Sequence, residues 1–345
     1  MKACVLHRIG DLRYEDAPVP EIAPDEVLLR VRAAGICGSD VPRVFTKGTY
    51  HFPTIPGHEF AGEAVKVNEG DEHLLGGRFA VFPLLPCFEC ESCAEKEYQQ
   101  CENYDYYGSR RNGAFAEYLA VKKWNLVPVP DSVSFEEAAM AEPCAVALHA
   151  LKRFGVNRGD TIAILGAGTI GLLAGQAACA WGAGRVILFD VDDRKLEFAR
   201  HIGFEDVSDS ATNDPADYVN ALTDGKGADI CLDAAGVSQT IEVAVRTAGR
   251  AGKVILMGNP AGDIKLAQKS YWEILRRQLT LKGTWNSSYS DGDNDWTQAL
   301  DSIGDGVFKL KPLITHRFTF SECGEAFRIA KDLNEFSVKV MFINE

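Results

Sequence analysis

The sequence lacks any apolar run that could cross a bilayer. A membrane helix needs about 20 consecutive apolar residues, and no stretch of the 345 residues comes close to that length. The first 16 residues, MKACVLHRIGDLRYED, meet charge within a few positions and contain no apolar core of a signal peptide. We therefore expect no membrane span and no export, which places the protein in the cytoplasm.

An excess of positive charge is also absent. The chain carries 36 Lys and Arg against 49 Asp and Glu, a net charge of −13. An acidic chain repels the phosphates of nucleic acids and of anionic lipids, so we expect neither as a partner. Repeats and low-complexity segments are missing too. The 46% of hydrophobic and 25% of charged residues indicate a globular protein of roughly two domains.

The pattern of apolar residues changes along the chain. The first 150 residues are rich in Gly, Pro and Cys and contain short apolar runs such as Val27–Arg32, which predicts an irregular β-rich domain. From residue 161, apolar runs alternate with helix-like segments, which predicts a parallel sheet covered by helices. The runs are Thr161–Leu165, Arg185–Phe189, Asp206–Ser208, Asp229–Leu232, Lys253–Met257 and Leu279–Lys282, and the helical segments include Ile170–Trp181 and Arg194–Ile202.

The fold class predicted from this pattern is α/β. We expect a first domain over residues 1–150, a nucleotide-binding domain over 151–283, and a final segment, 284–345, that returns to the first domain. The final segment contains a predicted helix, Cys323–Leu333, and a predicted strand, Ser337–Ile343.

A glycine-rich loop follows the first strand of the predicted sheet. Residues 166–171 read GAGTIG and open an apolar helix, which is the context that G-x-G-x-x-G needs in order to bind a dinucleotide. Gly166 permits a tight turn, Gly168 lets the backbone approach a pyrophosphate at the helix N-terminus, and Gly171 lets the helix pack closely. Thr169 and Ile170 begin the helix and are also expected at the cofactor.

An acidic residue ends the next strand. Asp190 closes VILFD, where a carboxylate binds the adenosine ribose hydroxyls and repels a 2′-phosphate. NAD is therefore favoured over NADP. Arg194, also expected beside the cofactor, and Lys195 are cations nearby and weaken that preference.

Two sets of residues have the chemistry of metal ligands. Ten cysteines in a cytoplasmic chain are not expected to form disulfides. Four of them follow the spacing C-x2-C-x2-C-x7-C within a lobe at about residues 86–102, and four thiolates can close a structural zinc site. An iron–sulfur cluster takes the same ligands, although nothing else in the sequence indicates electron transfer. The four are Cys87, Cys90, Cys93 and Cys101.

The second set is dispersed over GICGSD at 35–40, GHE at 57–59 and Glu142-Pro143. Together these segments supply one sulfur, one nitrogen and one or two oxygen ligands. That mixture suits a catalytic zinc, which keeps a position open for water or substrate.

These motifs together resemble the zinc-dependent medium-chain dehydrogenase family over essentially the whole chain. Within it, the chain resembles the polyol branch, which includes sorbitol dehydrogenases. The strings LLPCFECESC and YGSRRNGAFAEY are most similar to dehydrogenases of a polyol phosphate. The resemblance implies a doubly wound Rossmann domain beside a GroES-like catalytic domain that carries the zinc lobe.

The resemblance also implies roles for individual residues. It places Cys37, His58 and Glu142 on a catalytic zinc, with Glu59 as a neighbouring glutamate that ligates directly or through water. Cys144 is a rival to Glu142, and Ser39 would relay the proton of the substrate. Two zinc ions per subunit and NAD are the implied cofactors.

The implied reaction oxidises a secondary alcohol of a polyol phosphate to a ketose phosphate, with galactitol 1-phosphate to tagatose 6-phosphate as the leading case. Arg110 and Arg111, with Arg43 and Lys47, are candidate phosphate anchors because guanidinium groups bind phosphate well. An unphosphorylated polyol (sorbitol, xylitol or arabitol) or L-threonine would fit the same zinc site. A non-catalytic nucleotide-binding protein would fit the same fold. We expect a homodimer or a homotetramer.

Overall fold

The computed structural model describes residues 1–260 and 262–344. Contacts group them into two units. Unit 1 comprises Met1–Ala145 together with the chain from Ser288 onward, and unit 2 comprises Val146–Ser287. The domain boundaries expected from the sequence lay at 150/151 and 283/284, and the structural division falls at 145/146 and 287/288.

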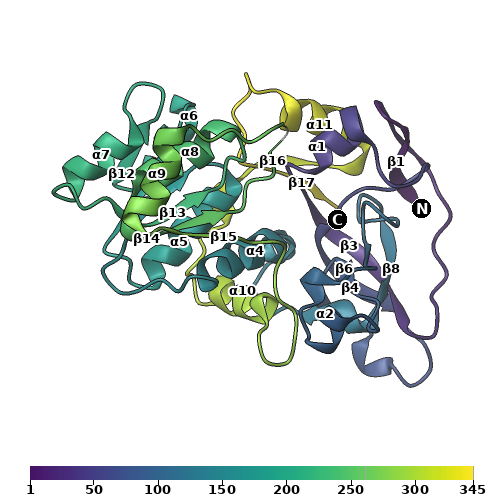
Figure 1. The fold of residues 1–345 in the computed structure, drawn as a ribbon. Helices are drawn as coiled ribbons and strands as arrows, with labels where there is room; N and C mark the ends of the chain where they lie inside the picture. The colour runs from purple at the N-terminus through teal and green to yellow at the C-terminus, as the bar shows by residue number, and fades with distance from the viewer. Residues whose placement is uncertain (261, 345) are drawn as a thin grey trace. The chain divides into compact units, whose positions relative to one another are not determined.

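Unit 1 is built on a seven-stranded sheet whose neighbours run in the order β16-β17-β3-β4-β5-β9, with β8 paired to another part of β3 (Figure 1). A hairpin, β1–β2, and a small sheet, β6–β7, accompany it. The strands are β1 (Lys2–Arg8), β2 (Asp11–Asp16), β3 (Glu26–Ile36), β4 (Glu59–Lys66), β5 (Arg78–Val81), β6 (Leu84–Leu85), β7 (Asp105–Tyr106), β8 (Tyr118–Lys122), β9 (Leu126–Pro128), β16 (Ile314–Phe318) and β17 (Lys339–Ile343).

Helices of unit 1 are short, and its core is aromatic and β-branched. Phe60, Phe115, Phe327 and Phe342 are buried in one cluster with valines of β3 and β8. The chain's last strand and helix therefore share the core formed by its first 120 residues. The helices are α1 (Asp40–Pro42), α2 (Glu91–Ala94), α3 (Phe135–Ala139), α10 (Asp295–Gly304) and α11 (Cys323–Lys331).

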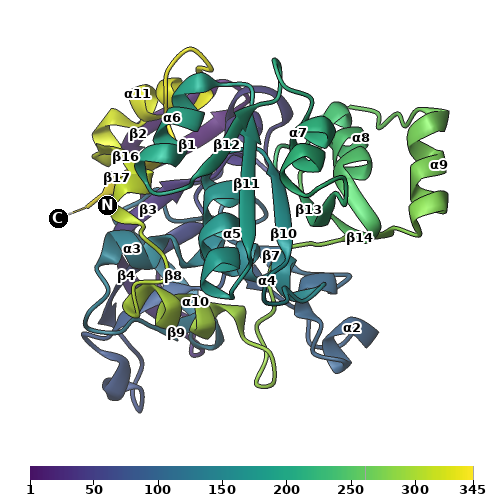
Figure 2. The same ribbon diagram turned by 90° about the vertical axis from the view of Figure 1, so that its left-hand side faces the viewer.

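Unit 2 contains a six-stranded parallel sheet in the order β12-β11-β10-β13-β14-β15 (Figure 2). Numbered from β10, this is the 3-2-1-4-5-6 order of a dinucleotide-binding fold, in which the direction of winding reverses between β10 and β13. The strands are β10 (Thr161–Leu165), β11 (Arg185–Asp190), β12 (Asp206–Asp209), β13 (Ala228–Asp233), β14 (Ala248–Leu256) and β15 (Thr280–Gly283).

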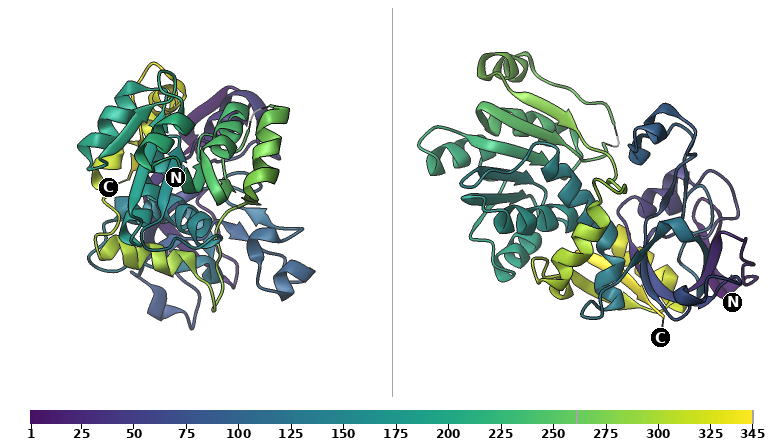
Figure 3. Two further views of the ribbon diagram at one scale, coloured as in Figure 1. Left: turned by 60° about the vertical axis from the view of Figure 1, so that its left-hand side comes forward. Right: turned by 90° about the horizontal axis from the view of Figure 1, so that it is seen from below.

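Helices cover both faces of this sheet (Figure 3, right). Helices α5 and α6 contact β10, β11 and β12, whereas α8 contacts β13 and β14, α9 contacts β14, and both α7 and α9 contact α8. The sheet is therefore buried on both sides, which explains the nearly continuous apolar runs of its strands. The helices are α5 (Thr169–Ala180), α6 (Asp193–His201), α7 (Pro215–Leu222), α8 (Ser238–Thr247) and α9 (Gln268–Arg277).

The predicted α/β alternation is confirmed, and the differences lie at element ends. Helix α4 (Ala141–Lys152) contains Pro143 in its first turn, where a missing N–H costs little. Glu142 is therefore a residue of that first turn. None of the described helices is long and apolar enough to cross a membrane.

Candidate functional site

The ends of two strands of unit 1 bring the dispersed ligand candidates together. Strand β3 ends immediately before Cys37, and β4 begins at Glu59 immediately after His58. The antiparallel register pairs Gly35 with Glu59. A Cβ atom at Gly35 would lie 2.4 Å from Glu59 Oε2, so only glycine leaves room for that carboxylate.

Cys37, His58 and Glu59 form one cluster of possible metal donors. One ligand atom from each, a sulfur, a nitrogen and an oxygen, lies within 4.8 Å of the others. His58 and Glu59 are buried, and Cys37 is partly buried. A thiolate, an imidazole and a carboxylate at this spacing are donors that zinc accepts.

Neighbouring groups favour the metal-binding forms of two of these donors, Cys37 and His58. The backbone N–H and the hydroxyl of Ser39 both donate to Cys37 Sγ, at 3.5 Å and 3.3 Å, and such donors favour a thiolate. Asp40 Oδ1 lies 3.3 Å from His58 Nδ1, which leaves Nε2 as the nitrogen available to a metal. The donor set therefore fits zinc.

Asp40 is fully buried and has two roles. Its Oδ2 accepts the N–H of Cys37 at 3.0 Å, which fixes the turn that carries the thiol. Burial raises the pKa of Asp40, but the charges of His58 and Arg43 lower it to about 2. Burial likewise lowers the pKa of His58, and the neighbouring Asp40 outweighs that effect and raises it well above the ordinary value. Orientation of His58 by Asp40 was not predicted from the sequence.

Arg43 belongs to the same network. Its Nη1 donates to Ser39 Oγ and to Asp40 Oδ1, both at 2.9 Å. The sequence suggested Arg43 as a phosphate anchor, but the structure directs this nitrogen of its guanidinium at Ser39 and Asp40. A positive charge beside Ser39 Oγ stabilises negative charge on that oxygen.

Lys339 is a residue of this cluster that sequence reasoning missed. It opens β17, and its Nζ forms a buried ion pair with Glu59 Oε2 and donates to the carbonyl of Ile36 at 3.3 Å. Burial lowers the pKa of Lys339, but the Glu59 carboxylate outweighs that effect and raises it. The separation of 280 residues hides the pair from any local pattern.

Glu142 and Cys144, the two rival ligands, lie on α4 near the cluster but outside the three donors described above. Burial raises the pKa of Glu142 to about 7, with His58 opposing the rise and Glu59 adding to it. Burial also raises the pKa of Cys144 well above that of a free thiol. The structure therefore places Glu142 among the charges of the cluster without placing its carboxylate in the donor group.

The four spaced cysteines converge as their spacing predicts. One sulfur from each lies within 4.8 Å of the others, and the N–H of Cys87 donates to Cys101 Sγ at 3.2 Å. Backbone N–H groups lower the pKa of Cys90 to about 6. Four sulfurs with no other donor can form a closed, structural zinc site.

Aromatic contacts attach this lobe to the rest of unit 1. Phe88 and Tyr98 of the lobe lie edge-on to Trp124, with ring centres 5.0 Å and 5.2 Å away. Trp124 in turn packs against Tyr289 at 5.0 Å. These edge-to-face contacts fix the lobe to the rest of unit 1 independently of its four cysteines.

In unit 2, the glycine-rich loop has the geometry that its sequence requires. Gly166 has a φ of 112°, in the region that favours glycine, and Gly168 is the N-cap of α5. Thr169 and Ile170 open that helix. A Cβ at Gly171 would lie 1.9 Å from the carbonyl oxygen of Gly166, so the helix can approach the strand only with glycine there.

Asp190 is tied to the loop. Its Oδ2 accepts the N–H of Ala167 at 2.8 Å, and Oδ1 accepts that of Val191 at the same distance. Arg194 is engaged with the neighbouring Asp192 through two hydrogen bonds, at 2.9 Å and 2.7 Å. The acidic residue and the loop therefore form one unit at the end of β10 and β11.

The adjacent arginines Arg110 and Arg111 have different surroundings. The guanidinium of Arg110 lies between two rings, 4.4 Å from the centre of Tyr50 and 4.1 Å from that of Tyr104. The guanidinium of Arg111 lies 5.1 Å from the ring centre of Tyr107. The two side chains therefore do not form one anion site.

Comparison with known proteins decides the family. Two family models match the chain: an alcohol dehydrogenase GroES-like domain over residues 23–131, and a zinc-binding dehydrogenase over 169–305. Galactitol 1-phosphate 5-dehydrogenase of Escherichia coli (strain K12) is 37% identical over 99% of this chain and 100% of its own length. The chain belongs to the zinc-dependent medium-chain dehydrogenase family.

Other members of this dehydrogenase family agree in sequence and in fold. Sorbitol dehydrogenase of Bacillus subtilis (strain 168) is 32% identical over 99% of the chain and 96% of its own length. The crystal structure of galactitol-1-phosphate dehydrogenase from Escherichia coli matches with a TM-score of 0.93 and 37% identity, covering 100% of both chains. Membership confirms the predicted resemblance, the two-part fold and an oxidoreductase of the polyol branch that uses zinc and a nicotinamide cofactor. Membership of the family does not identify which polyol is the substrate.

The glycine loop of this dehydrogenase gives the first prediction. We expect Gly171→Ala to destabilise the protein by about 1–3 kcal/mol, because its new methyl group overlaps the Gly166 carbonyl. Gly168→Ala should leave the melting temperature unchanged, since nothing lies within 4 Å of its Cβ position. It should nevertheless weaken NADH binding at least tenfold by occupying the space of the pyrophosphate. Thermal unfolding and NADH fluorescence titration measure the two effects, and normal NADH binding by Gly168→Ala would contradict the assignment.

The buried ion pair between Lys339 and Glu59 gives the second prediction. Lys339→Met should lower the free energy of unfolding by about 3–5 kcal/mol, because the Glu59 carboxylate stays buried without its cation. Lys2→Met breaks an exposed pair with Asp16 and should cost at most about 1 kcal/mol. Urea denaturation measures both. The double variant Lys339→Met/Glu59→Gln should be more stable than Lys339→Met alone, and a double variant as unstable as the single one would refute the pairing argument.

Proposed function

We propose that this protein is an NAD-dependent, zinc-dependent dehydrogenase that oxidises a secondary alcohol of a polyol phosphate to a ketose phosphate. Galactitol 1-phosphate, oxidised to tagatose 6-phosphate, is the proposed substrate. The convergence of Cys37, His58 and Glu59 in one cluster carries the dehydrogenase assignment. The similarity to galactitol 1-phosphate 5-dehydrogenase supports the substrate.

Zinc held by Cys37, His58 and a carboxylate of Glu59 or Glu142 would polarise the substrate hydroxyl and lower its pKa, and NAD would accept the hydride. Asp40 keeps the imidazole of His58 oriented. Ser39 would relay the hydroxyl proton to solvent: its Oγ gives up its own proton as it takes up that of the substrate, and the N–H that Arg43 donates stabilises the oxygen while it carries negative charge. Asp190 favours NAD over NADP, and the engagement of Arg194 with Asp192 supports that preference.

Arg110 is the proposed anchor for the phosphate group. It donates to the carbonyl of Tyr104 at 3.0 Å and to the Tyr50 hydroxyl at 3.3 Å, and its other N–H groups have no acceptor within the described residues. The Tyr104 ring contacts Tyr106, whose ring centre lies 5.7 Å from that of His58. This row of rings connects the anchor to the metal donors, which suits a phosphate that is several carbons from the oxidised carbon.

We propose that the enzyme works in the cytoplasm as a homodimer or homotetramer. All ten cysteines are free thiols, as a reducing compartment would keep them. Strand β15 is an edge strand without a partner on its outer side among the described residues, and such an edge is available to a second chain. Sedimentation equilibrium measures how many chains associate.

The substrate assignment predicts the outcome of an activity panel. NADH formation at 340 nm by the zinc-loaded enzyme should be fastest with galactitol 1-phosphate, compared with galactitol, sorbitol, xylitol, arabitol, arabitol phosphate and L-threonine. Arg110→Gln should raise KM for the phosphorylated substrate about ten- to a hundredfold, the value of a charge-assisted hydrogen bond. It should leave the KM of a free polyol unchanged. Arg328→Gln, on the surface of α11, is the matched control.

A preference for galactitol over its phosphate would overturn the phosphate proposal and leave the zinc site standing. Equal losses with both substrates in Arg110→Gln would remove the anchor role. No NAD reduction with any alcohol would favour the non-catalytic alternative.

The two metal clusters predict two zinc ions per chain. Elemental analysis of the purified protein should find two, and Cys93→Ser and His58→Ala should each retain one, because the clusters share no residue. Cys179→Ser alters an exposed cysteine outside both clusters and should retain two. A variant of one cluster that loses both ions would show that the sites are not independent.

A further inference from the structure

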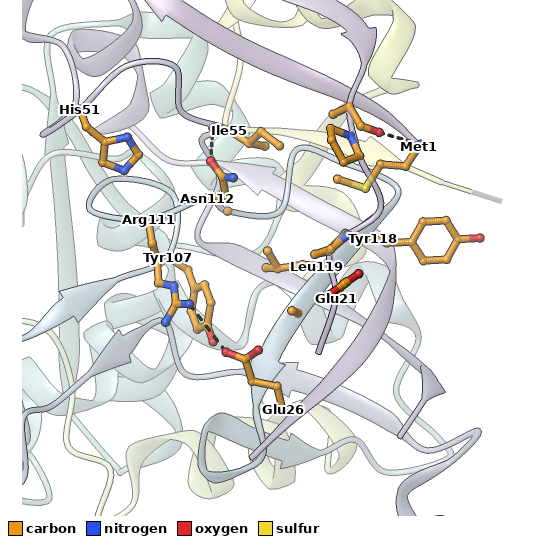
Figure 4. Close-up of a pocket in the computed structure, with 15 residues that line it drawn as sticks. Met1, Glu21, Glu26, His51, Ile55, Tyr107, Arg111, Asn112, Tyr118 and Leu119 are labelled. Atoms are coloured by element: carbon orange, nitrogen blue, oxygen red, sulfur yellow. Dashed lines mark hydrogen bonds and ion pairs between the residues drawn. The ribbon is translucent and has the colours of Figure 1, made fainter. Parts of the chain in front are cut away.

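Two buried carboxylates of unit 1, Glu59 and Glu26, lie next to cations. Glu59 forms the buried ion pair with Lys339. Glu26 Oε1 lies 3.4 Å from Lys122 Nζ and 3.7 Å from Arg111 Nη2, and Figure 4 shows the contact with Arg111. Removing a carboxylate from water is costly, and a cation beside it offsets that cost.

Asp233 of unit 2 is buried without such a cation. It ends β13, and its side chain is fully buried. Its Oδ1 accepts the N–H groups of Ala235 and Gly236, at 3.2 Å and 3.0 Å, and the hydroxyl of Thr240 at 2.8 Å. Three donors on one oxygen hold a carboxylate. No Lys, Arg or His side chain forms an ion pair with it in residues 1–260 and 262–344, so no side chain there cancels its charge.

The second oxygen of Asp233, Oδ2, makes the charge harder to explain. It is buried and has no hydrogen-bond partner within the described part of the chain. It faces Gly258, where a Cβ would lie 3.0 Å from it. An asparagine would accept the same three bonds through its own Oδ1 without burying a charge. Folding of this loop therefore requires the shape and the Oδ1 acceptor of Asp233 but not its negative charge.

The position of Asp233 in the sheet indicates what the charge does. Strands β10 and β13 are neighbours, and Leu165 is paired with Asp233. The next residues lie against the glycine loop, since the N–H of Ala234 donates to the Leu165 carbonyl at 2.9 Å and a Cβ at Gly166 would lie 3.1 Å from the nitrogen of Ala235. The direction of winding reverses between these two strands, and a dinucleotide crosses the sheet at such a point.

The two halves of the sheet bind the two halves of a dinucleotide. Asp190, at the end of β11, identifies β10–β12 as the half that binds adenosine. The nicotinamide half of NAD therefore belongs to β13–β15, where Asp233 lies. The oxidised nicotinamide ring carries one positive charge, and the reduced ring carries none. A negative charge on this side of the crevice attracts NAD⁺ more strongly than NADH.

This attraction requires no contact between the two groups. At an effective dielectric constant of about 20, two unit charges about 12 Å apart change an affinity by about a factor of ten. Burial also protects the charge of Asp233 from screening by salt. The end of β13 is therefore a place from which one carboxylate can distinguish the two redox states of the cofactor.

We propose that the buried charge of Asp233 stabilises the oxidised cofactor and thereby sets the ratio of the affinities for NAD⁺ and NADH. The residue does not touch the reacting atoms and acts only through its charge. Weaker binding of NADH relative to NAD⁺ favours release of the reduced cofactor after an alcohol is oxidised. This inference rests on the proposed use of NAD and is independent of which polyol is the substrate.

Equilibrium binding of both cofactor forms to the zinc-loaded, full-length enzyme tests this role. Nicotinamide fluorescence measures NADH binding, and calorimetric titration measures NAD⁺ binding. Asp233→Asn should raise the ratio of the Kd for NAD⁺ to the Kd for NADH about tenfold. ADP-ribose, which lacks the nicotinamide ring, should bind the variant and the unaltered enzyme equally well.

Three further variants separate the charge from the fold of the loop. Asp229→Asn is the matched control, because it neutralises an exposed carboxylate at the opposite end of β13, roughly 13 Å away along the strand. It should leave the ratio unchanged. Thr240→Val removes one donor to Asp233 Oδ1 and keeps the charge, so it should change both affinities by the same factor. Asp233→Glu also keeps the charge and should keep the ratio within threefold.

An unchanged ratio in Asp233→Asn overturns the proposal. Equal losses of NAD⁺ and NADH affinity in that variant overturn it too, because they would show that Asp233 only shapes the loop. If Asp233→Asn does not fold, a ratio that changes in Thr240→Val or in Asp233→Glu overturns the proposal, and a constant ratio in both supports it. Failure of the unaltered enzyme to bind NADH at all would instead overturn the use of NAD, and this inference with it.

Discussion

The buried ion pair between Lys339 and Glu59 holds the centre of unit 1 together. It forms because β3 pairs with β4 on one side and with β17 on the other, so that Gly35 lies opposite both Glu59 and Met341. The same pairing places Cys37, at the end of β3, beside His58. Two charges removed from water are stable only as a pair, so the last strand of the chain is as necessary to the cluster as the first.

The remaining charges around the cluster follow from this arrangement. Asp40 and Glu142 are buried with Glu59, and Arg43 and Lys339 provide the compensating cations. Carboxylates and a thiol gathered at one place raise the free energy of their charged forms unless a cation is near. A metal cation held by Cys37, His58 and Glu59 would offset this repulsion, and its binding would then stabilise unit 1.

The sequence predicted the features that depend on local spacing. The loop Gly166–Gly171 and the four cysteines of the lobe each lie within 15 residues, so their geometry follows from turns and strands that the chain forms nearby. Lys339 could not be found in this way, because 280 residues separate it from Glu59. The position of Glu142 outside the donor group depends on where α4 begins, and a proline in a first turn leaves that start open.

The loop that carries Arg110 and Arg111 begins as strand β7 and continues as a turn. Successive side chains of an extended segment point to opposite sides, and the segment that starts at β7 shows this alternation. Tyr106 packs beside His58, whereas Tyr107 accepts the N–H of Lys122 and packs against Arg111. The arginines follow in a turn, where Gly108 has a φ of 79° and the N–H groups of Arg110 and Arg111 both donate to the Tyr106 carbonyl, so their different partners follow from the turn. A single loop therefore places Tyr106 beside the metal donor His58 and Tyr107 beside Lys122 and Arg111.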